Sequence, residues 1–569
     1  MVMQRQLSLI EVVMTLAELS RDPGSDYGEV FTRRWVVELI LDLAGYMEDE
    51  DLGARRLVEP SCGTGAFLVP VVDRLIASCL RHGRDLGSLG GAVRAFDLLE
   101  ANAQRARKAT ALRLEEAGLD QATAEEIAAT WVTTGDFLLT DHELGSAHHV
   151  VGNPPYIRLE NVRPEVMDAY RRRCTTMRGR SDIYVGFIEQ GLDLLAPDGT
   201  LGFICADRWM HNQYGADLRA LVGRSFAVDT VVTMHDVVAF DEEVSAYPAI
   251  VVLRNGAQRR AVVADASADF GEPQAAKLSH WARRTRRAAL STPSVEASRI
   301  DGWFDGGDLW PTGSPAQLAL VAELESKFPP LEDVRTGTRV GIGVATGCDD
   351  VYITSDADLV EEDRLLPLLR AGDLVGGEPA WSGGLLVNPW DGDGLVDLDR
   401  YPRLRRYLRA NADRLKRRHT ARKNPEQWYR TIDRVHVDLQ SRPKLVLPDI
   451  KAAAHPVLDD GRYYPHHNLY FVTSERWDLE VLGGFLLSDV ANLFVGAYCV
   501  KMRGGCFRFQ AQYLRRIRVP DPASLRVAER RELAAAFGER DKDRATAAAA
   551  RVFGIDAQLL AAGGPAAPR

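Results

Sequence analysis

Asn153, Pro154, Pro155 and Tyr156 are consecutive residues whose types suggest a specific chemistry. Two prolines in a row remove two backbone N–H donors, so the main chain there offers only acceptors. The amide carbonyl of Asn153 adds another acceptor. Two converging acceptors match the two hydrogens of an NH2 group on a planar ring. Holding those hydrogens out of the ring plane localises the nitrogen lone pair for attack on an electrophile, while Tyr156 supplies a stacking face. The structural alternative is a rigid turn after a strand.

A loop with two glycines, upstream of this tetrapeptide, predicts a cofactor site. Residues 58–68, Val-Glu-Pro-Ser-Cys-Gly-Thr-Gly-Ala-Phe-Leu, follow a predicted strand and open a predicted helix. A doubly wound sheet binds nucleotides at this position. Leu68 replaces the third glycine of the pyrophosphate-binding pattern. We therefore expect a ligand without phosphate, S-adenosylmethionine, with its ammonium group near Glu59. The expected binding residues of the loop are Glu59, Pro60, Ser61, Cys62, Gly63 and Gly65.

Acidic residues end the next two predicted strands. Asp97 follows the apolar run 92–96 and is the expected acceptor for ribose hydroxyl groups. It lies 34 residues after Gly63, beyond the usual spacing of about 20, and a glycine-rich loop at 81–91 accounts for the excess. Asp136 and Phe137 end the following strand, where a carboxylate can accept a hydrogen bond from an adenine amino group and a ring can stack on it.

Short apolar runs alternate with helical stretches through the first half of the chain. Strands are predicted at 56–59, 92–96, 131–134, 148–151 and 201–205, and helices at 66–80, 101–117 and 184–195. This alternation is typical of an α/β protein with a doubly wound, Rossmann-like parallel sheet covered on both faces. Two more apolar runs, at 229–234 and 249–253, are expected to form an antiparallel edge.

After Pro329-Pro330 the pattern changes to short apolar runs among frequent Gly, Pro and Asp, which predicts a second, α+β domain. Between Arg403 and Lys451 there are fifteen Lys and Arg and five Asp and Glu, a balance of +10 in a chain of net charge −10. Such a segment suits duplex DNA, read in its grooves by Arg and Lys. The predicted divisions are an N-terminal helix (1–26), a catalytic domain (27–255), a connector (256–330), a recognition domain (331–520) and a C-terminal helix and tail (521–569).

Composition excludes several classes of protein. Of 569 residues, 46% are apolar and 26% charged, so neither wholesale disorder nor a fibrous repeat is expected. Seven scattered cysteines without a CxxC pair give no disulfide framework or zinc ribbon, which fits a reducing cytoplasm. A cytoplasmic protein that binds DNA is expected to be nucleoid-associated. The N-terminus lacks the pattern of a signal peptide. Asp489 and Asn492 interrupt the apolar stretch 481–500, so no membrane span is expected.

These motifs, in this order, resemble the γ-class adenine-N6 DNA methyltransferases of the TaqI type, to about Pro520. The resemblance rests on the glycine loop, Asp97, Asp136-Phe137 and the Asn153–Tyr156 tetrapeptide. It extends to residues 27–32, 182–187 and 194–203 and, for a specificity domain, to 341–349, 366–369, 504–509 and 513–520.

The resemblance implies methyl transfer from S-adenosylmethionine to an adenine flipped out of double-stranded DNA. It implies that Tyr27, Thr32 and Asn153 belong to the cofactor site and that Phe240, with Tyr156, sandwiches the flipped base. No metal is implied. The resemblance also implies a restriction-modification or other phage-defence system, with a separate restriction endonuclease or defence proteins as partners.

Three alternatives stay open. Methyltransferases of release-factor glutamine and of rRNA guanine share the tetrapeptide, but they are much shorter and lack such a second domain. A non-catalytic specificity subunit is disfavoured by the intact Asn153, Asp97 and Asp136. Glu325 and Lys327 have the ExK spacing of a nuclease metal site, with Asp308 as the nearest upstream acid. They lie in a helical pattern, however, so we expect a solvated helix pair.

Overall fold

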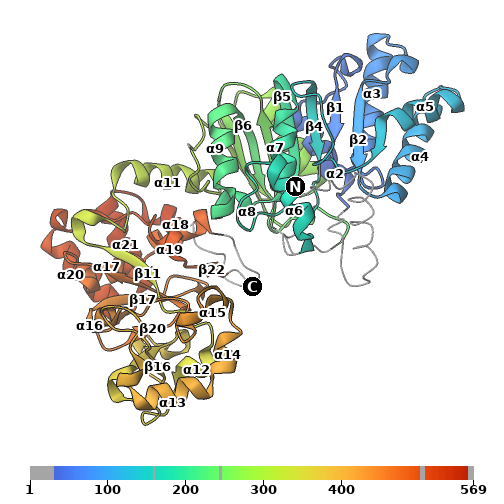
Figure 1. Cartoon of the computed structure of the whole chain (residues 1–569). Helices are drawn as coiled ribbons and strands as arrows, with labels where there is room; N and C mark the ends of the chain where they lie inside the picture. The colour runs from blue at the N-terminus through green and yellow to red at the C-terminus, as the bar shows by residue number, and fades with distance from the viewer. Residues whose placement is uncertain (1–30, 158–160, 243–246, 305, 500–505, 562–569) are drawn as a thin grey trace. The chain divides into compact units, whose positions relative to one another are not determined.

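The computed structural model describes residues 31–157, 161–242, 247–304, 306–499 and 506–561 (Figure 1). The chain forms two compact units, residues 1–315 and 316–569. The helix predicted at 1–26 lies outside the described residues.

The first unit is built on one ten-stranded sheet with the order β3-β2-β1-β4-β5-β7-β6-β8-β10-β9. Strands β1 to β5 pair in parallel, and β7 runs antiparallel between β5 and β6. The parallel strands are covered on both faces, which explains their nearly continuous apolar sequences. The strands are β1 (Leu57–Glu59), β2 (Val93–Asp97), β3 (Val132–Thr134), β4 (Ala147–Gly152), β5 (Leu195–Ala206), β6 (Ala227–Thr233), β7 (Pro248–Arg254), β8 (Ala261–Ala266), β9 (Ala289–Thr292) and β10 (Val295–Ile300).

Two apolar clusters flank this sheet. Val150 and Val151 are neighbours on β4 but belong to different clusters, because successive side chains of a strand point to opposite faces. One cluster includes residues of α2 (Arg34–Ala44), α3 (Leu68–His82), α4 (Glu100–Glu116), α5 (Gln121–Trp131) and α10 (Glu272–Arg284). The other includes residues of α6 (Pro164–Arg173), α7 (Tyr184–Asp193), α8 (Arg208–His211) and α9 (Ala216–Ser225).

Much of the segment predicted to be a connector, 256–330, is part of this sheet. Strand β8 pairs with β6, and β10 and β9 continue the sheet beyond it. The predicted runs at 229–234 and 249–253 are β6 and β7, which lie inside the sheet and not at its edge. Strands β9 and β10 are not predicted from the sequence because they are partly exposed and therefore lack a continuous apolar run.

The second unit contains two four-stranded sheets, β11-β21-β17-β19 and β12-β16-β13-β20, so it is α+β as predicted. Two short pairs, β14 with β15 and β18 with β22, accompany them. The strands are β11 (Arg339–Ile342), β12 (Ile353–Thr354), β13 (Leu365–Leu369), β14 (Leu374–Val375), β15 (Glu378–Pro379), β16 (Leu385–Val387), β17 (Lys444–Pro448), β18 (Ile450–Lys451), β19 (Val457–Asp459), β20 (Tyr464–Pro465), β21 (Leu469–Thr473) and β22 (Phe507–Arg508).

The helices of the second unit include the C-terminal segment, which was predicted to be a separate helix and tail. Leu487 of α17, Ala536 of α20 and Ala545 of α21 share one buried cluster, so these helices belong to the unit's core. The helices are α11 (Pro315–Lys327, starting at the boundary), α12 (Asp349–Tyr352), α13 (Pro402–Ala410), α14 (Ala412–Lys416), α15 (His419–Lys423), α16 (Val437–Ser441), α17 (Leu479–Leu487), α18 (Asp489–Tyr498), α19 (Ala511–Leu514), α20 (Val527–Gly538), α21 (Lys542–Phe553) and α22 (Ala557–Ala561).

Within the described segments, no single helix has the length and apolar composition to cross a membrane. Helices α17 and α18 together meet those criteria, with a bend of 60° between them. Most of their residues are buried inside the second unit.

Candidate active site

A pocket lies where the parallel strands β1, β2, β3 and β4 end, as expected for a doubly wound sheet. The loop after each of these strands contributes residues to it, and α6 and α7 complete the wall. The lining residues are Phe31, Thr32, Glu59, Pro60, Ser61, Cys62, Gly63, Thr64, Ala66, Phe67, Asp97, Leu98, Leu99, Gly135, Asp136, Phe137, Asn153, Pro155, Tyr156, Ile157, Asn161, Val162, Tyr170, Ile183 and Phe187.

Glu59, the last residue of β1, places a carboxyl group in this pocket with little solvation. It is 1% exposed, and neither of its side-chain oxygens has a hydrogen-bond partner among the described residues. Burial, and secondarily the charge of Asp97, holds the pKa of this carboxyl group well above its usual range. A buried acid without a partner is costly, so Glu59 is suited to a ligand that brings a cation or a donor.

The glycine loop and the acid of β2 are bound to each other. Gly63 has φ 54°, a left-handed conformation that favours glycine, and its N–H donates to Asp97 Oδ2 at 2.9 Å. The Leu99 N–H donates to Asp97 Oδ1 at 2.9 Å. Both carboxylate oxygens are therefore fixed in direction, and a carboxylate oxygen can accept more than one hydrogen bond. Gly65 is not among the lining residues; its φ is 104° and it packs near Ala106 of α4.

Asp136, after β3, is held by two internal donors. Its Oδ1 accepts from the Leu138 N–H at 2.9 Å, and its Oδ2 accepts from the Tyr170 hydroxyl at 2.6 Å. Burial raises the pKa of Asp136. Phe137 is 2% exposed, and its ring stacks on that of Phe187, with centroids 5.4 Å apart and planes at 21°.

Asn153 follows β4, and neighbouring segments orient both its backbone and its side chain. Its Nδ2 donates to Thr32 Oγ1 at 3.1 Å, and its backbone carbonyl accepts from Ser61 Oγ at 3.0 Å. Because Nδ2 is directed at Thr32, the amide is oriented by a residue 121 positions earlier in the chain. Pro155 lines the pocket with Asn153, whereas Pro154 is buried and is not among the lining residues.

Tyr156 and Phe240 are neighbours but do not form parallel faces. Their ring centroids are 6.1 Å apart and their planes are at 81°, an edge-to-face contact. Phe240 is 5% exposed, is absent from the lining residues, and is paired with Thr32 through a backbone bridge. A base could be sandwiched between these two rings only after Phe240 had moved.

The structure thus brings together most of the residues that the sequence singled out. Tyr27 lies outside the described residues, and Gly65, Pro154 and Phe240 flank the pocket without lining it. Sequence analysis missed Tyr170 of α6, and it named Phe187 of α7 only as part of the matching stretch 182–187, not as a site residue. No spacing rule connects Tyr170 with Asp136, because the contact depends on how α6 packs.

Comparisons with known proteins agree with this geometry. A family model described as Eco57I restriction-modification methylase matches residues 96–240, which run from β2 to Phe240. The type II methyltransferase M.PaeR7I of Pseudomonas aeruginosa is 44% identical over 534 residues, which cover 93% of this chain and 92% of that protein. M.XhoI of Xanthomonas vasicola is 43% identical over 546 residues, which cover 93% of this chain and 97% of that protein.

Solved structures show the same fold. The type IIL restriction-modification enzyme MmeI, solved in complex with DNA, has a TM-score of 0.57 at 11% identity, covering 98% of this chain and 78% of that chain. The predicted α/β fold with a second domain is confirmed. Identity of 38–44% with three type II methyltransferases over 88–93% of the chain settles the family. The chain therefore belongs to the DNA methyltransferases of type II restriction-modification systems.

Proposed function

We propose that this chain transfers a methyl group from S-adenosylmethionine to the N6 amino group of an adenine flipped out of double-stranded DNA. The observation that carries the proposal is the placement of the Asn153 amide, oriented by Thr32, in one pocket with Glu59, Asp97 and Asp136. A methyl acceptor and a nucleoside-containing cofactor need such groups side by side.

The polar side chains of the pocket fit S-adenosylmethionine. Glu59 has two buried oxygens without a hydrogen-bond partner among the described residues, which suits the ammonium group of the methionine part. Asp97 is directed by two backbone N–H groups and suits ribose hydroxyls. Asp136 and Phe137 suit the adenine part. When bound there, the cofactor supplies a methyl group on a positively charged sulfur.

The chain's own residues then have to hold and orient the target amine. The Asn153 side-chain oxygen and the Pro154 carbonyl would each accept one hydrogen of the NH2 group, which turns the nitrogen lone pair away from the ring. Tyr156 would stack on the base, and burial raises the pKa of its hydroxyl group well above the usual range. The phenol therefore stays neutral and acts as a surface, not as a base. After transfer the cationic nitrogen loses a proton readily, so no strong base is needed in the pocket.

Double-stranded DNA is the proposed substrate, and the second unit is proposed to select the site. MmeI, which shares the fold, was solved with DNA bound. The segment 403–451 of this chain, with its local balance of +10, is the proposed region of phosphate contact. Flipping would bring the base to the pocket, because the amine is inaccessible inside a duplex.

Mass spectrometry of nucleosides tests this assignment. Plasmid DNA from a host without adenine methylation is incubated with the protein and S-adenosylmethionine and then digested to nucleosides. We expect N6-methyladenine in wild-type reactions and at least about 100-fold less with Asn153→Ala, the loss typical of removing one preorganised group at a reacting centre. N4-methylcytosine as the product would overturn the adenine assignment, because cytosine carries a similar planar amine.

A binding control separates loss of chemistry from loss of structure. Asn153→Ala should bind S-adenosylmethionine with nearly unchanged affinity in calorimetry, because its proposed partner is the target amine. A large loss of cofactor affinity in this variant would show that the proposed role of Asn153 is wrong.

A further inference from the structure

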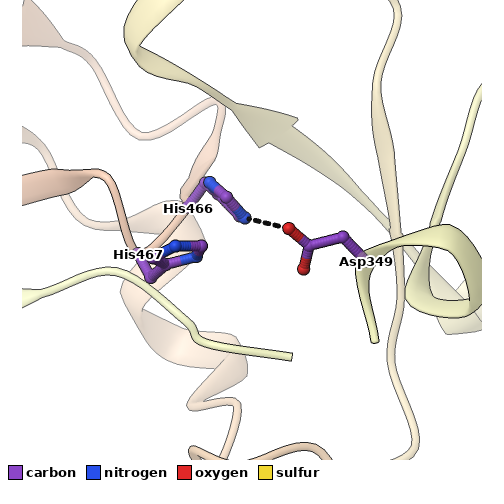
Figure 2. A group of neighbouring side chains, drawn as sticks. All are labelled: Asp349, His466 and His467. Carbon is purple, nitrogen blue, oxygen red and sulfur yellow. Dashed lines mark hydrogen bonds and ion pairs between the residues drawn. The ribbon is translucent and has the colours of Figure 1, made fainter. Parts of the chain in front are cut away.

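Three side chains of the second unit form a cluster that the proposed methyl transfer does not use (Figure 2). Asp349 begins α12, and His466 and His467 follow β20. One ligand atom of each residue lies within 4.8 Å of the corresponding atoms of the other two. Figure 2 shows the Asp349 carboxylate directed at the His466 ring, with the His467 ring beside it.

The distance between Asp349 and His466, which form a long hydrogen bond, is also the distance expected between two ligands of one metal ion. His466 Nε2 and Asp349 Oδ2 form a hydrogen bond of 3.3 Å, longer than the 2.7–3.2 Å that N–H···O bonds usually span. Two ligands bound tetrahedrally to zinc, each at about 2.0–2.2 Å from the ion, are roughly 3.3–3.5 Å apart. The observed distance therefore leaves room for an ion between the two atoms.

Backbone contacts hold the two segments of the cluster together. The Val344 N–H donates to the Pro465 carbonyl at 2.9 Å, and the His467 N–H donates to the Val344 carbonyl at 3.0 Å. A Cβ atom on Gly343 would fall 2.2 Å from the His466 carbonyl oxygen, so this close approach requires glycine. Hydrogen bonds of the main chain therefore hold the three candidate metal ligands in place without a metal ion.

A neighbouring hydroxyl also orients the acid. Thr346 Oγ1 donates to Asp349 Oδ1, which leaves Oδ2 facing His466. Metal-binding carboxylates are typically hydrogen-bonded in this way by residues outside the ligand set. The Asp349 side chain is 45% exposed and His467 is exposed, so an ion could enter from solvent.

We propose that Asp349, His466 and His467 bind one divalent cation of the zinc class. Two imidazole nitrogens and one carboxylate oxygen are a donor set that zinc accepts, and a fourth position would stay open to water. The ion would link the loop around residues 343–349 to the segment around residues 464–469. This inference does not rest on the proposed methyl transfer, and it adds a metal to a chain whose sequence implied none.

Zinc titration of the whole chain tests the proposal. Protein freed of metal by chelation is titrated with zinc chloride in a calorimeter, beside the variants His467→Ala and Asp349→Asn. Wild type should bind one ion, and each variant should bind it at least about tenfold more weakly, since even residues outside the ligand set typically change affinity by 10–100-fold. His419→Ala removes an exposed histidine of α15 in the same unit and should bind like wild type.

Cobalt(II) gives a second readout that does not depend on heat or on activity. Wild type loaded with cobalt should show the visible absorption of a four-coordinate site, and His467→Ala should lose it. The proposal is overturned if wild type binds no zinc, or if His467→Ala and wild type bind it with equal affinity. Because His466 is buried, substitution there is avoided, and a folding defect cannot be mistaken for loss of a ligand.

Discussion

Asn153 can direct either its carbonyl oxygen or its NH2 group toward a substrate, and only the oxygen can accept a hydrogen from an amine. In the structure its Nδ2 donates to the Thr32 hydroxyl at 3.1 Å. Thr32 is 5% exposed and lines the same pocket. The family resemblance assigns Thr32 to the cofactor site, whereas the observed contact indicates that it positions the amide of Asn153.

Thr32→Val and Thr32→Ser separate these two roles. Valine removes the acceptor, and a neutral hydrogen bond is worth about 0.5–1.5 kcal/mol, so kcat should fall roughly 2- to 12-fold with little change in KM for S-adenosylmethionine. Serine keeps the hydroxyl and should restore kcat. Steady-state kinetics measures both. If valine raises KM for the cofactor and leaves kcat unchanged, Thr32 acts through the cofactor instead.

The raised pKa of Glu59 predicts that cofactor binding depends on pH. Its pKa is raised well above the usual range by burial and by Asp97, so without a bound cation the protonated form is favoured up to that raised pKa. An ammonium group favours the ionised form, and binding then releases a proton. Affinity should fall by up to about tenfold for each pH unit below the raised pKa and should level off above it.

Calorimetry in two buffers of different ionisation enthalpy measures this proton release directly. Wild type should give buffer-dependent binding heats below the raised pKa. Glu59→Gln keeps the size of the side chain but cannot ionise, so its heats should be independent of the buffer and its affinity weaker at high pH. If the binding heats of wild type and Glu59→Gln depend equally on the buffer, the released proton comes from a group other than Glu59.

At the level of elements, the cations of the basic segment 403–451 differ in how far they are available to DNA. Several of its cations are used inside the fold: Lys444 forms a buried ion pair with Asp459 at 2.7 Å, and Arg418 donates to four backbone carbonyls. The side chains of other cations, on or between helices α13 to α15, are exposed and form no ion pair or hydrogen bond with any described residue. These are Arg406, Arg409, Arg417, Arg422 and Lys423.

Charge reversal at Arg406 and Arg409 of α13 should therefore weaken DNA binding for specific and nonspecific sequences alike. Each lost phosphate contact should reduce the slope of log affinity against log salt by about 0.9. The matched control is Arg405→Glu with Arg442→Glu, an equal change in charge at cations already paired with Asp399 and Asp438. Binding measured at several salt concentrations should change less in the control, and a loss confined to the specific site would indicate base contacts.

In helix α11, the two residues with nuclease-like spacing, Glu325 and Lys327, are engaged in contacts with other side chains. Glu325 accepts a hydrogen bond from the Tyr498 hydroxyl at 2.9 Å and pairs with Arg518 at 3.4 Å. Lys327 pairs with Glu323 at 2.6 Å. Glu325 and Lys327 are thus not the solvated pair expected from the sequence, because Glu325 is committed to contacts within the second unit.

For the whole molecule, the pocket around Asn153 predicts methylation, and the contacts that occupy Glu325 predict that the chain does not cut DNA. Plasmid incubated with the protein, S-adenosylmethionine and magnesium should acquire methyl groups and remain uncut on a gel. A mock preparation from the same host without the protein, purified in the same way, is the control: a contaminating nuclease would cut in both samples. Linear plasmid in both preparations would point to contamination, whereas cleavage that persists after rigorous purification would contradict the prediction of a single activity.

The sequence by itself determined the order of the pocket's parts. Glu59, Asp97, Asp136 and Asn153 each follow a short buried strand, and parallel strands present their carboxyl ends at one edge of a sheet. Local patterns were therefore enough to place these four residues together. The change in the sequence pattern after Pro329-Pro330 likewise indicated a second α+β unit. This change lies close to the observed boundary between the two units, at residues 315 and 316.

Only the tertiary structure decided which side chains meet across long stretches of chain. Thr32 reaches Asn153, Tyr170 reaches Asp136 and Asp349 reaches His466 because separate elements pack together. Strands β8, β9 and β10 belong to the sheet because they pair with strands that local sequence patterns cannot identify as their partners. Periodicity reports which face of an element is buried, but the partner of a polar group depends on the packing of distant segments.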